Sequence, residues 1–544
     1  MLARSAFKVK LSHSITSSLN FYIRTMSTSS TSSAPVASTS TAPSTSSPQS
    51  DAPATAQLLP TSTPSELSSS LSIASSLLHS NLPVAFPTET VYGLGASALS
   101  SLAVKRIFAA KGRPSDNPLI VHIGSRSMLD KLLPRKKKTG ELMGMNRMYE
   151  SLIEKFWPGP LSLIFPLSTT TSPSLSTQEE EEWEEPEWKV VPEVTASRPS
   201  LCIRMPSHPL ALELLKTSNL PLAAPSANLS SRPSPTSARH VMDDLGEGRG
   251  VGAVLDGGKC KVGVESTVVD YLETLEGGRV RVLRAGGISQ EDIEECLRDA
   301  GITTTSTTEG GGGKGFVQVY SRDFKSSSLE SNPTTPGMKY KHYSPGNSKV
   351  VLVRGVKGSQ ILPSIQELVQ LSCLTQSTEG RRFRVGLMLT HSTLSSLLRS
   401  EESTTTTTTT ENDEIEEPVE IQLPPPPPSL FAQLTSGEDS NLPPLSSIEI
   451  LSLPLTSSPS STREVGEEAA SRLFHGLRKF DSLPLSPSDS DSTTGEEGKG
   501  KGREGVDLIL VECVEETKIG LAVMERARKA AGGIERGGEM EFAL

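Results

Sequence analysis

Residues 82–95 read Leu-Pro-Val-Ala-Phe-Pro-Thr-Glu-Thr-Val-Tyr-Gly-Leu-Gly. The apolar run from Leu82 to Phe86 predicts a short strand, which ends at Pro87 because proline has no N–H to donate to a sheet. Two hydroxyls and two glycines follow, before a predicted helix at 102–110. Glycines let backbone N–H groups approach a ligand, so the segment can hold a small polar molecule. An ordinary strand–turn–helix connection has the same pattern, and spacing alone favours that simpler interpretation.

Strand-like and helix-like segments alternate on both sides of this stretch. Leucines and alanines at helical spacing predict a helix over 65–80. Further expected strands are 119–123, 201–205, 220–224, 253–256, 266–271 and 280–284, and further expected helices are 209–216 and 290–300. Many strands with intervening helices are typical of an α/β fold.

A second group of alternating segments begins near Lys349. Its expected strands are 349–353, 383–389 and 506–511, and its expected helices are 361–374, 464–480 and 518–531. Strands that alternate with helices indicate a small doubly wound unit. Low-complexity inserts interrupt this unit at 404–410, 424–428 and 486–505.

The bulk composition argues against several classes of protein. The chain has 544 residues and a formal net charge of -10, whereas a dedicated nucleic-acid binder usually carries a basic surface. Its five cysteines are scattered and form no Cys-x-x-Cys pair, which argues against a disulfide scaffold or a zinc site and favours a reducing compartment. No apolar run approaches the roughly 20 residues that cross a bilayer.

The first 64 residues differ from the rest of the chain. Residues 1–26 contain basic residues and serines but no acid, which is typical of a mitochondrial transit peptide and equally of a disordered basic tail. We expect a cytoplasmic protein, with an additional mitochondrial form if this segment is a transit peptide and a second start lies at Met26. Residues 27–64 are rich in Ser, Thr, Ala and Pro, and we expect disorder there.

Cations follow the helix predicted at 102–110. Lys111 and Arg113 flank a glycine at the helix end, where they can meet a phosphate or simply complement the helix C-terminus. The chain has no GxxxxGK[ST] loop, so a nucleotide site here must be of another kind. His122 ends the next predicted strand, and a lone histidine is more often a satisfied core residue than a catalyst.

Three further segments carry candidate binding residues. Arg204 lies in an apolar strand, where a buried cation needs an anionic partner, either from a ligand or from a structural Asp or Glu. Ser226, Asn228 and Ser234 offer hydrogen-bonding groups without bulk. Residues 336–346, between the two domains, are expected to fold over a ligand. Together these residues suit a cavity that binds an anionic nucleotide and a small amino acid.

Eight motifs in fixed order carry a family resemblance. They are PTETVYGLG (87–95), KGRPSDNPLIVHI (111–123), FWPGPLSLIF (156–165), RMPSHP (204–209), PLAAPSAN (221–228), ESTVVD (265–270), LRAGGI (283–288) and PGMKYKHYSPG (336–346). The chain closely resembles the long, two-domain form of threonylcarbamoyl-AMP synthase. The resemblance is strong over 65–347 and weak over 348–532.

The resemblance implies a fold and a division into domains. We expect an α/β protein with a YrdC-like twisted mixed sheet around a deep cavity, plus a smaller Rossmann-like C-terminal domain. The implied parts are a disordered or targeting segment at 1–64, a catalytic domain at 65–302, a linker at 303–347 that closes the active site, and a C-terminal domain at 348–532. An acidic insert at 168–197, expected to be a solvated loop, interrupts the catalytic domain.

The resemblance also implies a reaction. L-threonine, bicarbonate and ATP would give threonylcarbamoyl-AMP, pyrophosphate and water, for threonylcarbamoyladenosine formation in tRNAs that read codons starting with A. Mg²⁺ would be held mainly by the phosphates of ATP, and no protein metal site is expected. The product would pass to a separate threonylcarbamoyl transferase complex, so tRNA would be an indirect partner, although double-stranded RNA binding stays open. No membrane partner is expected.

Residue roles follow from the matching motifs. Lys111 and Arg113 would be the catalytic cations at the phosphates. The L-threonine site would comprise Thr90, His122, Arg204, Ala224 and Ser266. The ATP site would comprise Arg113, Asn117, Ser200, Ser226, Asn228, Ser234, Arg284 and Tyr343, with Tyr343 supplied by the closing linker.

Three other functions stay open from the sequence. A nucleic-acid-binding module is disfavoured by the acidic balance and by the lack of interleaved aromatic and basic residues. A carbamoyltransferase subdomain, as in hydrogenase maturation proteins, would be accompanied by Cys-x-x-Cys motifs that this chain lacks. A regulatory protein with an inactive cavity is disfavoured by the presence of Lys111, Arg113, His122, Arg204 and Ser266.

Overall fold

The computed structural model describes most of the first domain and the main elements of the second. The described residues are 53–168, 182–272, 279–302, 316–331, 333–335, 343–354, 383–390, 392–393, 419–420, 448–455, 462–484, 505–531 and 539–541. The predicted helix at 361–374, the low-complexity inserts and most of the segment 336–346 lie outside these ranges.

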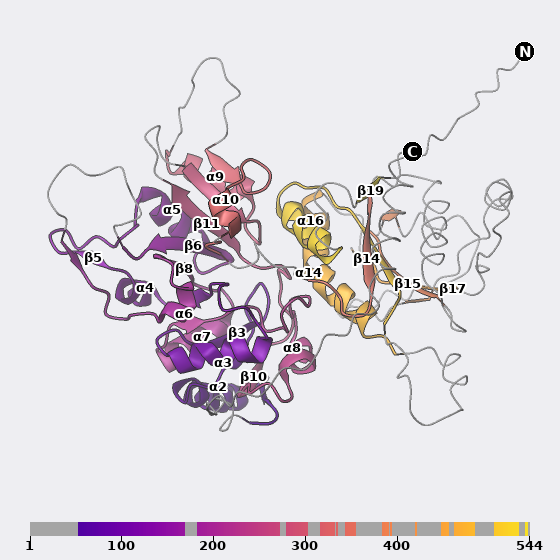
Figure 1. The fold of residues 1–544 in the computed structure, drawn as a ribbon, viewed down its shortest axis with the longest axis horizontal. Helices are drawn as coiled ribbons and strands as arrows, with labels where there is room; N and C mark the ends of the chain where they lie inside the picture. Colours follow the sequence, from indigo (N-terminus) through magenta and orange to yellow (C-terminus); the bar gives the residue numbers. More distant parts are fainter. Residues whose placement is uncertain are drawn as a thin grey trace, which may run out of the picture.

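A large sheet of mixed direction forms the framework of the first domain (Figure 1). Strand β8 (Ser200–Arg204) is parallel to its neighbour β4 (Ile120–His122) and antiparallel to its neighbour β6 (Leu161–Pro166). In spatial order the strands are β1 (Gln57–Pro60), β10 (Ala253–Asp256), β2 (Val84–Phe86), β3 (Gly93–Ser97), β9 (Leu222–Ala223), β4 (Ile120–His122), β8 (Ser200–Arg204), β6 (Leu161–Pro166), β11 (Thr267–Leu272), β12 (Arg279–Arg284) and β13 (Val317–Val319).

Helices in the first domain pack on this sheet. They are α2 (Pro64–His79), α3 (Ser101–Lys111), α4 (Arg126–Leu132), α5 (Arg147–Phe156), α6 (Pro192–Thr195), α7 (Pro209–Ser218), α8 (Ala238–Leu245), α9 (Gln290–Asp299) and α10 (Ser327–Ser331). The start of α2 is fixed by a capping box, in which the Thr63 hydroxyl accepts from the Glu66 N–H and the Glu66 carboxylate accepts from the Thr63 N–H.

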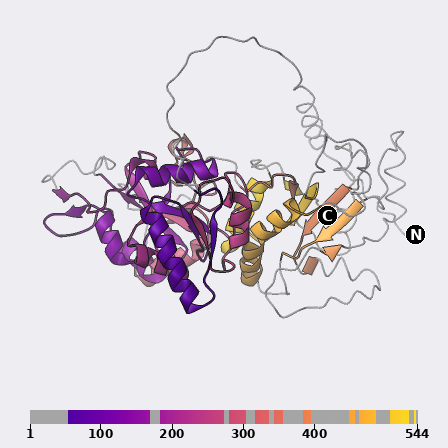
Figure 2. The same cartoon turned by 90° about the horizontal axis from the view of Figure 1, so that it is seen from below.

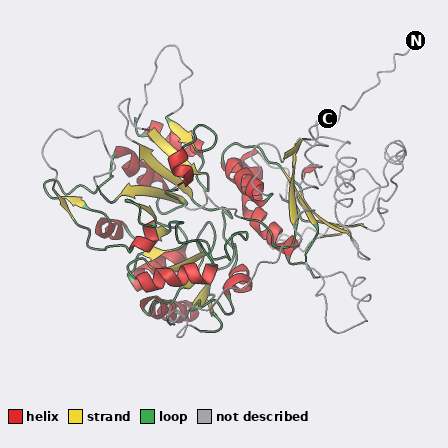
Figure 3. Cartoon of the chain, in the orientation of Figure 1, coloured by secondary structure: helices red, strands yellow, loops and turns green. Residues whose placement is uncertain are grey.

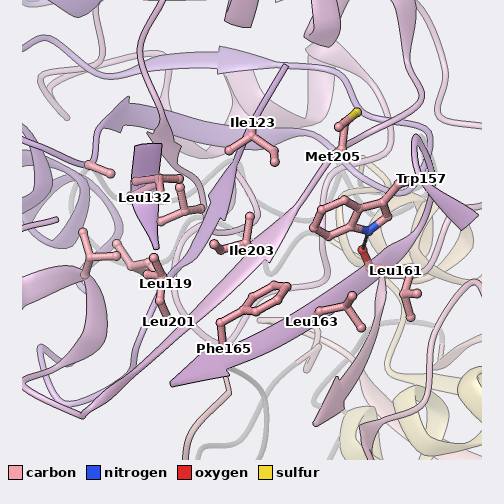
Figure 4. Close-up of a cluster of buried hydrophobic side chains, with 14 of the residues drawn as sticks. Leu119, Ile123, Leu132, Trp157, Leu161, Leu163, Phe165, Leu201, Ile203 and Met205 are labelled. Carbon is pink, nitrogen blue, oxygen red and sulfur yellow. Dashed lines mark hydrogen bonds between the residues drawn. The ribbon is translucent and has the colours of Figure 1, made fainter. Parts of the chain in front are cut away.

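The core of the first domain is built from alternate residues of its central strands. Figure 4 shows Leu201 and Ile203 of β8 beside Leu163 and Phe165 of β6. Trp157 closes one end of this cluster, and its indole N–H donates to the Leu161 carbonyl at 2.7 Å. Each large apolar side chain buried in this way contributes about 1.5–3 kcal/mol.

The second domain contains a sheet that is parallel except at one edge. In spatial order its strands are β16 (Val419–Glu420), β17 (Ile448–Ser452), β15 (Phe383–Met388), β18 (Leu508–Glu512), β14 (Lys349–Arg354) and β19 (Glu539–Glu541), and its helices are α14 (Thr462–Asp481) and α16 (Ile519–Ala530). The antiparallel pair is β16–β17. The expected two-domain architecture, with a mixed sheet and a Rossmann-like second domain, is therefore confirmed.

Helices α14 and α16 lie between the second sheet and the first domain, as the views in Figures 1, 2 and 3 agree. Helix α14 approaches its own sheet closely at Gly386, where an added Cβ would lie 2.7 Å from the ring of Phe480. The opposite side of α14 is thus available to the first domain. None of the described helices has the length and apolar composition that a bilayer crossing requires.

Two predictions about irregular segments were wrong. Residues 57–60, expected to be disordered, form edge strand β1, which pairs in parallel with β10 and buries Leu59. Only two adjacent leucines mark this strand, which is too little to stand out in a Ser/Thr/Ala/Pro-rich segment.

The second correction concerns the acidic insert at 168–197. Its described part contains α6 and a strand, β7 (Trp183–Glu184), which pairs with β5 (Arg135–Lys136). Lys137 donates to Glu182 at 3.0 Å and Lys131 to Glu187 at 2.9 Å. In the described part, Glu182 and Glu187 are exposed, as expected, but they pair with lysines, and a short strand stands where a loop was expected.

Candidate active site

One pocket gathers most of the predicted site residues. It occupies about 750 Å³, counted out to its open mouth, and is bordered by strand ends, the segment 224–234 and the linker residue Tyr343. The predicted residues that border it are Thr90, Lys111, Arg113, His122, Arg204, Ala224, Ser226, Asn228, Ser234, Ser266, Arg284 and Tyr343. The motifs, far apart in the sequence, thus meet in one cavity.

Two predicted residues lie away from the pocket. Asn117 is buried, and its N–H donates to the Pro114 carbonyl in the turn after α3. Ser200 begins β8 and is paired with Pro166 at the far end of that strand from Arg204. Neither side chain borders the cavity, so their assignment to a nucleotide site stays a prediction without support from this geometry.

The connection between β2 and β3 is ordered by its own hydroxyls. The Thr88 hydroxyl donates to the Val91 carbonyl at 2.6 Å, and the Thr88 and Thr90 hydroxyl oxygens are 2.7 Å apart. Since the Thr88 proton is used at Val91, Thr90 donates to Thr88. The Thr90 oxygen then accepts from Arg204 Nη1 at 3.0 Å. The segment is thus a constrained turn that presents Thr90 to the pocket.

Arg204 has a structural carboxylate partner. Its Nη2 lies 2.7 Å from Glu89 Oε1, and its Nε donates to the Gly159 carbonyl at 3.1 Å. Both side chains of the ion pair are buried. Of the partners that the sequence left open for Arg204, the structure shows the Glu within the chain, and the guanidinium still borders the cavity.

His122 is a neutral imidazole in this environment. Burial, reinforced by the charge of Arg204, lowers the pKa of His122 to about 3. Its Nδ1 lies 3.3 Å from the Ile120 carbonyl, and Phe86 meets the ring edge-on. His122 can therefore offer a hydrogen bond or a shape contact to a bound molecule, but it is not a cation near neutral pH.

Lys111 supports the part of the pocket wall that contains Ser226 and Asn228. Helix α3 ends at Gly112 with φ 59°, a left-handed conformation suited to glycine. The Lys111 amine is buried and donates to the carbonyls of Ser226 and Asn228, the latter at 2.5 Å. Burial and the nearby Arg113 lower the pKa of Lys111 well below its usual range. A bound anion would therefore favour its charged form.

The segment 226–234 is held by side-chain hydrogen bonds. The Ser226 hydroxyl donates to Asn228 Oδ1 at 2.5 Å, and Asn228 Nδ2 donates to the carbonyls of Leu229 and Arg232 at 2.6 and 2.9 Å. The Ser234 hydroxyl donates to Glu265 Oε1 at 2.6 Å. Small polar side chains thus form a lining with a defined arrangement.

Ser266 and Arg284 form the remaining polar wall. Arg284 Nη2 donates to the Ser266 hydroxyl at 3.0 Å and to its carbonyl at 2.9 Å. The Ser266 and Ser162 hydroxyls are 2.8 Å apart. Gly286 allows this approach, because an added Cβ would lie 2.3 Å from the backbone of Ser266 and Thr267.

Several pocket residues were not among the predicted site residues. The most informative is Glu265, which lies in the quoted ESTVVD motif and accepts from Ser234 in the cavity wall. The others include Arg232, whose Nη1 lies 2.7 Å from Asp244. The sequence signal for Glu265 was its place directly before the predicted site residue Ser266. Its partners come from distant segments, so the sequence did not show what the carboxylate contacts.

The described residues that line the pocket are suited to binding, and no cysteine is among them. Burial raises the pKa of Cys202 to about 12, so its thiol is inert, and none of the cysteines in the described segments forms a disulfide. Within those segments no group of three or more His, Cys, Asp or Glu is placed to hold a metal ion. Positioning and charge are therefore what this cavity offers chemically.

Two family models match the chain. A model described as "Telomere recombination" matches residues 76–286, and one described as "Threonylcarbamoyl-AMP synthase, C-terminal domain" matches residues 288–532. The first match ends just after β12, and the second begins just before α9, so the two matches together cover most of the described residues of both domains. The family resemblance inferred from the motifs is confirmed.

Relatives cover most of the chain. The threonylcarbamoyl-AMP synthase of Schizosaccharomyces pombe is 34% identical over 487 residues, which is 87% of this chain and 91% of that protein. The Pyrococcus abyssi protein of the same name is 33% identical over 461 residues, or 85% and 93% of the two chains. The crystal structure of P. abyssi Sua5 complexed with L-threonine matches with a TM-score of 0.52 at 30% identity, covering 85% of this chain and 94% of that chain.

Proposed function

The chain belongs to the threonylcarbamoyl-AMP synthase family, a family of nucleotidyltransferase-type enzymes, and from that membership we propose the reaction that its pocket performs. L-threonine, bicarbonate and ATP are converted into threonylcarbamoyl-AMP, pyrophosphate and water. The observation that carries the proposal is one cavity that joins Thr90, His122 and Arg204 at one wall with Lys111, Ser226 and Arg284 at others.

The chemistry requires no protein nucleophile. The threonine amine attacks CO2 derived from bicarbonate and gives a carbamate. A carbamate oxygen then attacks the α-phosphorus of ATP, a P–O bond forms there, and the bond to pyrophosphate breaks. No cysteine is among the residues that line the described pocket, and the Ser226, Ser234 and Ser266 hydroxyls are engaged in hydrogen bonds within its wall, which agrees with this route. Catalysis by orientation and by charge stabilisation is the expected mode for nucleotidyl transfer.

Threonine recognition falls to the wall formed by β2–β3 and β8. Thr90 and Arg204 are already joined by a 3.0 Å hydrogen bond, so both can meet the amino acid together. Arg204 attracts the threonine carboxylate, while Glu89 holds its guanidinium in place. Neutral His122, Ala224 and Ser266 complete the threonine pocket in this proposal. The L-threonine complex of the P. abyssi relative supports threonine as the amino acid.

ATP recognition falls to the segment 226–234, Arg113, Arg284 and Tyr343. Lys111 acts mainly through the carbonyls of Ser226 and Asn228, which it holds in position beside the phosphates. Glu265, which borders the pocket, and Glu89, which lies behind Arg204, are both paired with arginines. A Mg²⁺ ion would accordingly take its ligands from the phosphates, where it neutralises charge.

The product is an unstable acyl-adenylate-like anhydride, so it is suited to transfer onto another molecule. We assign that step to a separate threonylcarbamoyl transferase complex, acting on tRNAs that read codons starting with A. The cytoplasm is the proposed site of the reaction, with a mitochondrial form depending on residues 1–26. Fractionation with N-terminal sequencing of each form tests this location.

Pyrophosphate release by the purified chain tests the reaction. The assay contains ATP and Mg²⁺, and threonine and bicarbonate are omitted in turn. We expect release only when both are present, together with a product whose mass is that of threonylcarbamoyl-AMP. ATP hydrolysis that is indifferent to threonine would contradict the proposal.

A further inference from the structure

Glu265 is a shared acceptor for groups from separate segments of the pocket. Its carboxylate accepts from the Ser234 hydroxyl at 2.6 Å, and the Tyr343 hydroxyl also bonds to it. Arg284 lies close enough to influence its charge. Ser234, Arg284 and Tyr343 are all assigned above to ATP. A single buried carboxylate therefore connects these three parts of the nucleotide site.

An anionic group in this position is unfavourable for the proposed substrate. ATP carries several negative charges, and like charges in a buried site repel each other strongly. A carboxylate inside a nucleotide pocket therefore needs a compensating cation. Otherwise it would either repel the nucleotide or take up a proton, since burial alone raises the pKa of a carboxyl group.

The second domain supplies that cation. Arg526 of α16 is 1% exposed, and its Nε donates to Glu265 Oε2 at 3.0 Å. Its guanidinium also lies 5.9 Å from the centre of the Tyr343 ring. Burial by itself would raise the pKa of Glu265, but the charges of Arg526 and Arg284 outweigh burial and lower that pKa to about 2. Glu265 is therefore ionised and paired across the domain boundary.

The linker residue shares this arrangement. The Tyr343 ring stacks on Phe474 of α14, with centroids 4.9 Å apart. Its hydroxyl reaches Glu265 in the first domain. The docked second domain therefore supplies both Arg526, which pairs with Glu265, and Phe474, which orients the Tyr343 ring.

We propose that Arg526 is a positioning residue of the ATP site: by neutralising and orienting Glu265 it makes nucleotide binding depend on the docked second domain. Arg526 does not border the cavity, so it acts through Glu265 and not by contact with the reacting atoms. The inference rests on the proposed function, because it takes ATP to be the ligand near Ser234 and Tyr343. It gives the second domain a direct part in substrate binding.

Opposite effects of two substitutions distinguish this role from simple domain docking. In R526Q the Glu265 carboxylate stays in the pocket without its ion-pair partner and keeps only the more distant charge of Arg284, so ATP binding should weaken at least about tenfold. In E265Q the amide oxygen still accepts from Ser234 and Tyr343 while a negative charge is lost, so ATP should bind more tightly. The double variant R526Q/E265Q should return to within about threefold of the wild type.

Titration calorimetry of the full-length chain, with ATP and Mg²⁺ and separately with L-threonine, measures these affinities. Threonine affinity should not change in R526Q. The matched control is R528Q, which removes another arginine of α16, one that pairs with Glu516 in its own domain, and ATP affinity should not change. Thermal unfolding of each variant checks that it is folded, and if R526Q does not fold, E265Q alone decides.

Weaker ATP binding in both single variants, without recovery in the double variant, would overturn the inference, because a purely structural ion pair predicts that result. Weaker binding in E265Q alone would do the same. Unchanged affinity in R526Q, beside normal binding by the wild type, would overturn the inference and leave the proposed function intact. A wild-type chain that binds threonine but not ATP would instead overturn the proposed function, and the inference with it.

Discussion

Arg204 and Glu89 form a buried ion pair in the wall of the pocket, with Nη2 and Oε1 2.7 Å apart. The two residues come from β8 and from the turn between β2 and β3. A buried charge that loses its partner costs about 3–5 kcal/mol. This pair therefore has to be considered whenever either residue is changed, because an effect on binding is combined with an effect on stability.

The first prediction separates these two effects. R204A should lower threonine affinity at least about 100-fold and lower the free energy of unfolding by about 3–5 kcal/mol, since Glu89 is left unpaired. The double variant R204A/E89Q should regain much of that stability but not the threonine affinity. Calorimetry with threonine and urea unfolding measure the two quantities, and unchanged threonine affinity in a folded R204A protein would exclude the proposed role.

Arg204 also shows which part of the site the sequence could predict and which part it could not. An arginine in an apolar strand already required an anionic partner, and motif order placed it in the same site as Thr90. The sequence could not identify this partner as Glu89, because Glu89 and Arg204 become neighbours only when the β2–β3 turn and β8 lie side by side in the folded domain. Local pattern predicts that a charge must be satisfied, but the tertiary fold decides by which group.

Other differences have similar causes. Strand β1 was missed because an edge strand of four residues with one buried leucine carries little periodic signal. Asn117 and Ser200 lie inside or beside family motifs, yet their positions on the turn after α3 and at the start of β8 keep them from the pocket. Glu265 could not be identified as a shared acceptor, since Arg526 reaches it from 261 residues away. Within the described residues, the helices and strands that were predicted lie close to their observed bounds, whereas the amphipathic helices α5 and α8 and the buried strand β6 were not predicted.

A second prediction concerns Lys111, whose amine meets two buried carbonyls. K111M leaves the Ser226 and Asn228 carbonyls without this donor, and each unsatisfied group costs about 1–3 kcal/mol. The segment 226–234 should then lose its position, and ATP affinity should fall at least about tenfold. K105M on the same helix, at an exposed ion pair with Glu193, is the control, and equal ATP affinities in the two variants would contradict the assignment.

The third prediction is a pH dependence of stability that arises from His122. Its pKa is about 3 in the folded chain and about 6.5 when unfolded. Between these values the unfolded chain binds more protons, so the free energy of unfolding falls as the pH drops below about 6.5, by up to ~1.4 kcal/mol per pH unit. H122Q removes the titrating imidazole. The change of the free energy of unfolding with pH should therefore be smaller in H122Q, by up to ~1.4 kcal/mol per pH unit.

Urea unfolding at several pH values between 7 and 4 measures the slope. His240, whose pKa burial lowers to about 2, titrates in the same sense and stays in H122Q, so a smaller slope should persist. Identical slopes in the wild type and in H122Q would show that His122 is charged or solvated in the folded protein.

The last prediction separates the two parts of Tyr343. Its ring stacks on Phe474 and its hydroxyl meets Glu265, so Y343F keeps the stacking and loses only a hydrogen bond. We expect the KM for ATP to rise about three- to tenfold in Y343F, with kcat and the KM for threonine within about twofold of the wild type.

Y343A loses the buried ring as well, so it should raise the KM for ATP further and lower the free energy of unfolding by about 3 kcal/mol. Steady-state kinetics with each substrate varied in turn measure this. If Y343F and Y343A had the same KM for ATP, the stacked ring would contribute nothing to the nucleotide site, and the second domain would act on it through Arg526 alone.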